Sequence, residues 1–221
     1  NIKFENLGKT QVAYGADVIT RIQQAVQGKL AQLTQLIRHA MTDLTQTVCD
    51  DAGISPKKVG VVSVVGNPAM QQLFLGICPD NLSEVPFAPA LTEAKAVSCK
   101  KILPICSEAQ LLIVPDIAGF IGADTIGCLL ATKLYEDDTL TLLVDIGTNG
   151  EMAVCHSNSL TVCSTAAGPA FEGVGISMGM RGAAGAIDKV SLSGEKLESH
   201  VIGGGEAIGI CGSGLVDAAA A

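Results

Sequence analysis

The first long pattern of apolar positions in the chain predicts an amphipathic helix. Aliphatic residues recur at three- and four-residue steps from Val18 to Val48, which places them on one face of a helix. Asp17 is a candidate N-cap, and Gly53 is a candidate C-terminal stop. Gly28 lies inside the pattern and favours a break or kink. One long helix and two shorter helices both remain open.

Two aliphatic runs predict strands, at residues 59–65 and 111–114. The first run is continuous, which is typical of a strand covered on both faces. Each run ends in a polar turn, and a helix is expected after each, to about residue 75 in the first case and over 124–133 in the second. Residues 78–106 contain four prolines, so we expect an irregular or short-stranded segment there.

The remainder of the chain reads mostly as strands joined by short turns. A glycine-rich run follows them and leads into a helix of small residues. The expected strands are 140–144, 151–156, 160–164, 187–192 and 197–202, and the last two form a hairpin around Ser193-Gly194. Strands alternating with helices predict an α/β fold.

Composition narrows the class of protein. The chain is 48% hydrophobic but only 3% aromatic, so its core is built from small and aliphatic side chains, as suits α/β proteins. A net charge of -8 with only 14 Lys and Arg argues against a nucleic-acid partner. No apolar run approaches the roughly 20 residues that span a bilayer, which argues against membrane insertion. The eight cysteines are scattered without a Cys-x-x-Cys pair, which favours reduced thiols in a cytoplasmic compartment over a metal or cluster site in this segment.

The strongest chemical signal is a strand that ends at Asp145 and continues into a glycine-spaced polar turn. Glycines let backbone N–H groups approach phosphate oxygens, and a carboxylate after a strand can hold a hydrated magnesium ion. An ordinary hairpin with Asn149-Gly150 in a type I′ turn is the alternative. The candidate phosphate-binding residues are Gly147, Thr148, Asn149, Gly150 and Glu151.

Two further glycine turns are candidate parts of a nucleotide site. Glu172 and Gly173 follow a glycine turn at a predicted helix start, where Glu172 can bind a ribose hydroxyl or act only as a first-turn acid. Gly212, Ser213 and Gly214 open the last predicted helix, where free N–H groups attract anions. A simple packing turn explains that loop equally well. Gly66-Asn67 and Asp116, at predicted strand ends, are secondary candidates.

These motifs occur in an order that resembles a known superfamily. Residues 144–148, the following two strands and 168–173 are similar to the second phosphate-binding element of the actin, Hsp70 and sugar-kinase superfamily. More narrowly, the chain resembles the ATP-dependent reductive activators of corrinoid proteins. The motifs that carry this resemblance are residues 14–22, 66–70, 86–87, 119–124, 145–151, 166–173, 179–181 and 209–217.

The resemblance implies an actin-like ATPase fold of the ribonuclease H-like α/β type. It implies that ATP is coupled to reduction of Co(II) to Co(I) in a corrinoid protein, either a methyltransferase or a corrinoid iron-sulfur protein. Asp145 would hold Mg through water. The electron would come from a two-iron two-sulfur cluster in a ferredoxin-like domain outside this chain. A small-molecule kinase, a dehydratase activator and a nonhydrolytic nucleotide-binding scaffold remain as alternatives.

We expect this chain to be a fragment, incomplete at both ends. The family's first phosphate loop is expected before residue 1, and its adenosine-binding turn after residue 221. The expected lobes are residues 1–137, which include the irregular 78–106 segment, and residues 138–221, which carry the phosphate-binding hairpin. The isolated fragment is expected to be inactive, and a homodimer remains open.

Overall fold

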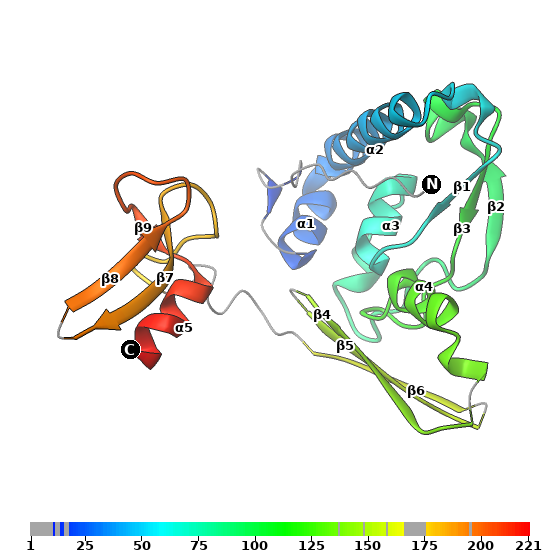
Figure 1. Ribbon diagram of the computed structural model, residues 1–221. Helices are drawn as coiled ribbons and strands as arrows, with labels where there is room; N and C mark the ends of the chain where they lie inside the picture. Colours follow the sequence, from blue (N-terminus) through cyan, green and yellow to red (C-terminus); the bar gives the residue numbers. More distant parts are fainter. Residues whose placement is uncertain are drawn as a thin grey trace. The chain divides into compact units, whose positions relative to one another are not determined.

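The computed structural model describes most of the chain (Figure 1). The described residues are 11, 14–15, 18–136, 138–147, 149–157, 159–165, 176–194 and 196–221. By their contacts they belong to two compact units, one of residues 1–145 and 151–164 and the other of residues 146–150 and 165–221. No helix within these described ranges is long and apolar enough to cross a membrane.

The N-terminal helical segment is broken at the glycine that the sequence singles out. Helix α1 (Val18–Gln24) continues through a π-helical stretch, η2 (Ala25–Lys29), into α2 (Leu30–Ala52). Gly28 has a φ of 91°, which a β-carbon would strain, so the predicted kink is confirmed. Gly53 ends α2 with a φ of 67°, as a left-handed C-cap. The N-cap prediction for Asp17 falls outside the described residues.

A three-stranded sheet with the order β1-β3-β2 forms the centre of the first unit. Strands β1 (Val61–Val64) and β3 (Gln110–Ile113) are parallel, while β2 (Lys95–Ser98) pairs with β3 in the antiparallel direction. Helix α3 (Pro68–Leu75) follows β1 and α4 (Ala123–Thr132) follows β3. The short 3-10 helices of this unit are η3 (Pro56–Lys58), η4 (Asp80–Leu82), η5 (Cys99–Lys101), η6 (Pro104–Cys106) and η7 (Leu134–Glu136). The irregular segment predicted at 78–106 is therefore confirmed, with β2 as its one short strand.

One prediction about β1 is wrong. The continuous aliphatic run suggested a strand covered on both faces, but burial alternates along β1, and Val61 is 58% exposed. The reason is that β1 buries only the face that carries Val62 and Val64, and burial alternates in the same way along the central strand β3. That face joins the largest apolar cluster, which includes Phe74, Leu103 and Leu111.

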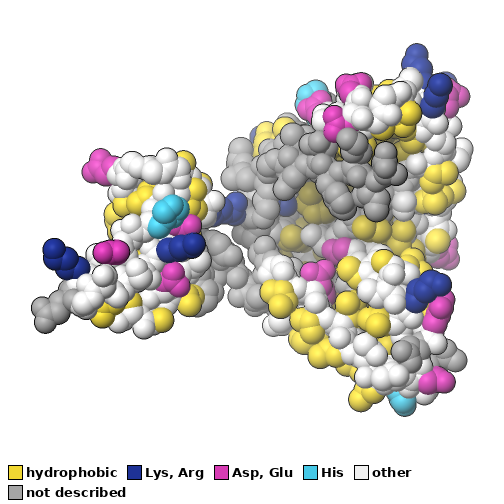
Figure 2. Space-filling model, viewed as in Figure 1, with side chains coloured by type: hydrophobic (Ala, Val, Ile, Leu, Met, Phe, Trp, Pro, Cys, Tyr) yellow, Lys and Arg dark blue, Asp and Glu magenta, His cyan; other side chains and the backbone are white. Residues whose placement is uncertain are grey.

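A second sheet in the first unit has the order β4-β5-β6. Its strands are β4 (Thr141–Ile146), β5 (Gly150–His156) and β6 (Ser159–Thr165). One face packs on α4, where Leu129 joins Ala153 and Cys155 in a buried cluster. The other face leaves apolar side chains such as Leu142 and Val144 exposed. Figure 2 shows hydrophobic side chains at the surface of the molecule.

The second unit is a small sheet with the order β8-β7-β9, covered by one helix. Strands β7 (Ala186–Ser193) and β8 (Lys196–Val201) form the predicted hairpin, and Gly194 in its turn has a φ of 65°. Strand β9 (Gly209–Ile210) is parallel to β7 and leads directly into α5 (Gly212–Ala220). The predicted small-residue helix is confirmed.

Candidate functional site

Asp145 lies near the end of β4 on the face of the sheet that packs against α4. Burial alternates strictly along β4, so the half-buried Asp145 shares a face with Leu143, which contacts the cluster around Leu129. On β5, Glu151 shares its face with the buried residue Ala153 in the same way. Two strand carboxylates are therefore turned toward the same helix.

Helix α4 contributes a third carboxylate in its first turn. Asp124 is half-buried, and burial, followed by the negative charge of Asp145, raises the pKa of Asp124 above its ordinary value. Burial and then the charge of Asp124 likewise raise the pKa of Glu151, although Ser164 donates to Glu151 at 3.4 Å. These carboxylates repel one another electrostatically, so they form a site that favours a proton or a cation.

A fourth carboxyl group, Asp116, is buried at the start of α4. Its Oδ1 accepts from the backbone N–H of Ala123 at 3.2 Å and from Nε2 of Gln71 at 3.4 Å, while its Oδ2 is buried without a hydrogen-bond partner. Burial raises the pKa of Asp116 to about 7. The hydrogen bond from Ala123 lowers this pKa, and the charge of Asp124 raises it further. Asp116 therefore takes up or releases a proton near neutral pH.

Gln71 connects the carboxyl ends of the two parallel strands to Asp116. Besides Asp116, its amide donates to the carbonyl oxygens of Gly66 and Val114, at 3.4 and 3.3 Å. A β-carbon on Gly122 would lie 2.5 Å from the oxygen of Gly66, so the start of α4 packs directly against this loop. The secondary candidates at the two strand ends are thus brought together.

Asn67 has a structural role in this loop. Its side chain accepts from the backbone N–H of Met70 at 2.9 Å, which makes it the N-cap of α3.

The turn between β4 and β5 differs from the hairpin that was the alternative to phosphate binding. The backbone N–H of Gly147 donates to the oxygen of Asn149 at 2.9 Å. Gly150 does not have the positive φ that a type I′ turn requires, so that turn type is wrong, although β4 and β5 are neighbours in the sheet as a hairpin would place them. Gly147 is exposed, and Thr148 lies outside the described residues.

The start of α5 packs tightly on β7. A β-carbon on Gly214 would lie 2.3 Å from the oxygen of Ile187, so close packing alone explains a glycine at this position. Gly212 is half-buried and Ser213 is exposed at the first turn of the helix. The Ser213 hydroxyl, 3.4 Å from the sulfur of Cys211, lowers the pKa of that thiol, and the Gly214 N–H adds to the effect. Glu172 and Gly173 fall outside the described residues.

Cysteines and metal-ligating residues form no direct metal site in the part of the chain that the structure describes. All eight cysteines are free, and burial raises the pKa of Cys99 and Cys106, as for thiols in an apolar core. No group of three or more described His, Cys, Asp or Glu side chains is arranged to hold a metal ion. A hydrated Mg²⁺ keeps several of its waters when it is bound, so it needs few direct protein ligands, and the candidates for holding it are Asp145, Asp124 and Glu151.

Two functional features were missed by reasoning from the sequence. Asp124 was noted only within a motif, although the glycine before α4 and an acid in its first turn are a signal that could have found it. Gln71 carried no signal, because its three acceptors come from residues far apart in the sequence.

Two family models together match nearly the whole chain. Residues 2–137 match the RACo middle region, and residues 139–221 match the C-terminal domain of RACo, the ASKHA domain. The fold and these matches define an ASKHA-type protein with an actin-like α/β architecture, as predicted. The chain belongs to the RACo family, and the expected similarity to reductive activators of corrinoid proteins is confirmed by the relatives below.

The chain is similar to characterised relatives over part of their length. It is 40% identical over 215 residues to the corrinoid activation enzyme RamQ of Eubacterium limosum, covering 95% of this chain and 36% of that protein. It is 35% identical over 134 residues to a [Co(II) methylated amine-specific corrinoid protein] reductase of Methanosarcina barkeri, covering 51% of this chain and 25% of that one.

A solved structure of a reductive activator for corrinoid, iron-sulfur protein matches with a TM-score of 0.72 and 37% identity. The match covers 95% of this chain and 34% of the solved one. The chain therefore spans about a third of the length of RamQ and of the solved activator.

Proposed function

We propose that this chain is the ATPase part of a reductive activator, which couples ATP to the reduction of Co(II) to Co(I) in a corrinoid protein. The convergence of Asp145, Glu151 and Asp124 on one face of the β4-β5-β6 sheet carries the proposal. The names of the relatives, a corrinoid activation enzyme and a Co(II) corrinoid protein reductase, support the choice of reaction.

In this proposal the carboxylates hold a hydrated Mg²⁺ that accompanies ATP, with Asp145 as the principal residue. The raised pKa values of Asp124 and Glu151 reflect burial and mutual repulsion, which a divalent cation would relieve. The cation supplies charge neutralisation at the phosphates. The backbone from Gly147 to Gly150 contacts phosphate oxygens, and Thr148 and Asn149 add side-chain hydrogen bonds.

The remaining parts of the nucleotide site are proposed from the sequence. Glu172 and Gly173, with the Gly212-Ser213-Gly214 loop, line the nucleoside side. The exposed hydroxyl of Ser213 at the start of α5 supports a polar contact there. Gly214 contributes to this contact only indirectly: its close approach to β7 fixes the position of α5, which carries Ser213.

The electron in this proposal comes from a two-iron two-sulfur cluster in a separate domain of the longer protein. The corrinoid partner is a methyltransferase or a corrinoid iron-sulfur protein. Eight free cysteines suit the reducing cytoplasm, where we place the protein. A lobe boundary between residues 137 and 138 and a homodimer both stay predictions.

The test is ATP-dependent Co(I) formation by the full-length protein carrying Asp145→Ala. Loss of one preorganised electrostatic group lowers a rate by roughly 100-fold, and we expect a loss of that order. The matched control is Asp138→Ala, which removes an exposed carboxylate just ahead of β4 and leaves the rate unchanged. An undiminished rate in the Asp145 variant would exclude that residue from the mechanism. Phosphoryl transfer to a small molecule, without Co(I), would assign a kinase instead.

A further inference from the structure

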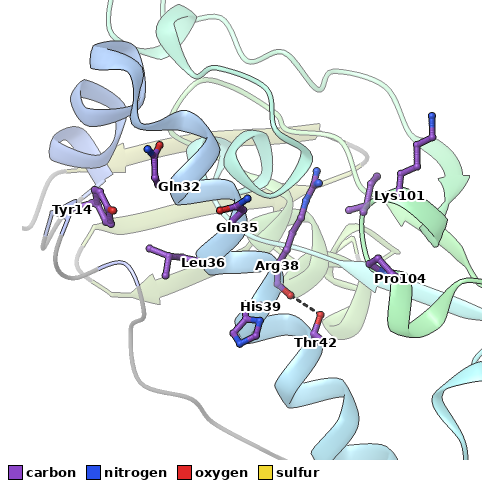
Figure 3. Close-up of a pocket in the computed structure, with 10 residues that line it drawn as sticks. Tyr14, Gln32, Gln35, Leu36, Arg38, His39, Thr42, Lys101 and Pro104 are labelled. Carbon is purple, nitrogen blue, oxygen red and sulfur yellow. Dashed lines mark hydrogen bonds between the residues drawn. The ribbon is translucent and has the colours of Figure 1, made fainter.

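A cleft of about 740 Å³ runs along helix α2 (Figure 3), and none of the carboxylates described above lines it. One wall is the face of α2 between Gln32 and Thr42, whose lining residues recur at three- and four-residue steps. The rest of the lining comes from Tyr14 and from Lys101, Ile102 and Pro104, in and beside the 3-10 helices η5 and η6. At 1.5 Å per residue, the helical wall is about 15 Å long.

The charge of this cleft is opposite to that of the chain as a whole. Its described lining includes Arg38, His39 and Lys101 but no Asp or Glu. The whole chain, by contrast, has 22 acidic and 14 basic residues. His39 lies 3.8 Å from Asp43, an exposed neighbour on α2. Because Asp43 offsets any charge on His39, the positive charge of the cleft comes from Lys101 and Arg38.

Arg38 is held in place by the protein itself. Its Nε donates to the carbonyl oxygen of Phe74 at 2.8 Å, and Figure 3 shows its side chain extending from α2 toward the wall that carries Lys101. A guanidinium with one nitrogen anchored in this way keeps its other N–H groups for a ligand, because Arg has five donors.

The rest of the lining suits a polypeptide better than a small ion. The exposed amides of Gln32 and Gln35 have no hydrogen-bond partner among the described residues, and one turn of helix separates them. Amides can donate to and accept from a peptide backbone. Leu36, Ile102 and Pro104 add apolar surface. A lone phosphate would fill only a small part of a cleft about 15 Å long.

We propose that this cleft docks an acidic segment of a protein partner. Carboxylates of the segment pair with Lys101 and Arg38, its backbone bonds to the glutamine amides, and its apolar side chains contact Leu36 and Ile102. The inference rests on the proposed function, which makes the partner the Co(II) corrinoid protein.

The experiment measures binding of the full-length protein to a methylated amine-specific corrinoid protein in its Co(II) state, by biolayer interferometry at 50 and 300 mM KCl. Lys101→Glu reverses one lining charge, and the matched control is Lys100→Glu in the same 3-10 helix, which does not line the cleft. We expect Lys101→Glu to raise the Kd roughly fivefold or more at low salt and less at high salt. Gln35→Glu acts in the same direction, and Lys100→Glu leaves the Kd unchanged.

The outcomes separate this inference from the proposed function. If the wild type binds the partner and forms Co(I), but the Lys101 and Lys100 variants bind equally well, the cleft is not the docking site and the proposed function stands. If the wild type neither binds the partner nor forms Co(I), both proposals fail. ATP hydrolysis measured without partner stays at the wild-type rate in all three variants, since none changes a residue of the nucleotide site.

Discussion

Asp116→Asn tests the role of the buried carboxyl group at the start of α4. Asparagine keeps an oxygen to accept from Ala123 and Gln71 but cannot ionise. In the wild type the pKa of Asp116 is raised from 3.8 to about 7, chiefly by burial. A carboxyl whose pKa is raised in the folded state stabilises that state at low pH, and this contribution is lost as the pH rises through the folded pKa.

The size of the effect follows from proton linkage. One pKa unit corresponds to about 1.4 kcal/mol, so a rise from 3.8 to about 7 gives a full difference of roughly 4 kcal/mol. Between pH 5 and pH 8, about 2.5 kcal/mol of that difference is lost in the wild type. The asparagine variant has no such loss at this position.

The assay is hydrogen exchange followed by mass spectrometry in peptides that cover residues 110–125, from pH 5 to pH 8, corrected for intrinsic exchange. We expect the free energy of opening to fall with pH more steeply in the wild type than in Asp116→Asn. Glu93→Gln, which neutralises an exposed carboxylate, is the control and follows the wild-type curve. Parallel curves for the wild type and Asp116→Asn would refute the reasoning.

Two glycine substitutions test close packing in each unit. Gly119→Ala places a β-carbon 1.9 Å from the oxygen of Phe87. We expect this substitution to lower the free energy of unfolding, measured in urea, by about 1–3 kcal/mol. Gly60→Ala, whose β-carbon meets no atom within 4 Å, serves as the control. A change in Gly119→Ala no larger than in the control would contradict the contact. Gly214→Ala meets the oxygen of Ile187 at 2.3 Å, so we expect faster hydrogen exchange in β7 and α5, and wild-type protection would count against that packing.

The elements with strong periodicity were predictable because their signals are local. The kink at Gly28, the hairpin turn at Gly194 and the segment order all followed from spacing and turn chemistry. Strand β2 was not predicted as a separate element, because its four residues form a strand through pairing with β3. The exposure of Val61 was also missed, since an aliphatic run does not reveal which face a neighbour covers.

The candidate site was predictable only in part, because a local pattern shows which residues share a face but not which distant segments pack against that face. Asp145 and Glu151 follow from the strand and turn pattern, and alternation assigns each a face of its strand. Packing between segments distant in sequence brings both faces against α4 and adds the charge of Asp124 there. The three bonds of the Gln71 amide likewise exist only once β1, β3 and α3 are assembled.

The most direct test of the central claim is to follow cobalt and ATP together. The full-length protein, its reductant and the Co(II) corrinoid protein are mixed, and Co(I) absorbance and phosphate release are recorded with and without Mg-ATP. The account predicts that Co(I) accumulates only with ATP and that phosphate release accompanies it. Equal Co(I) in the absence of ATP, or ATP hydrolysis without any Co(I), would contradict it.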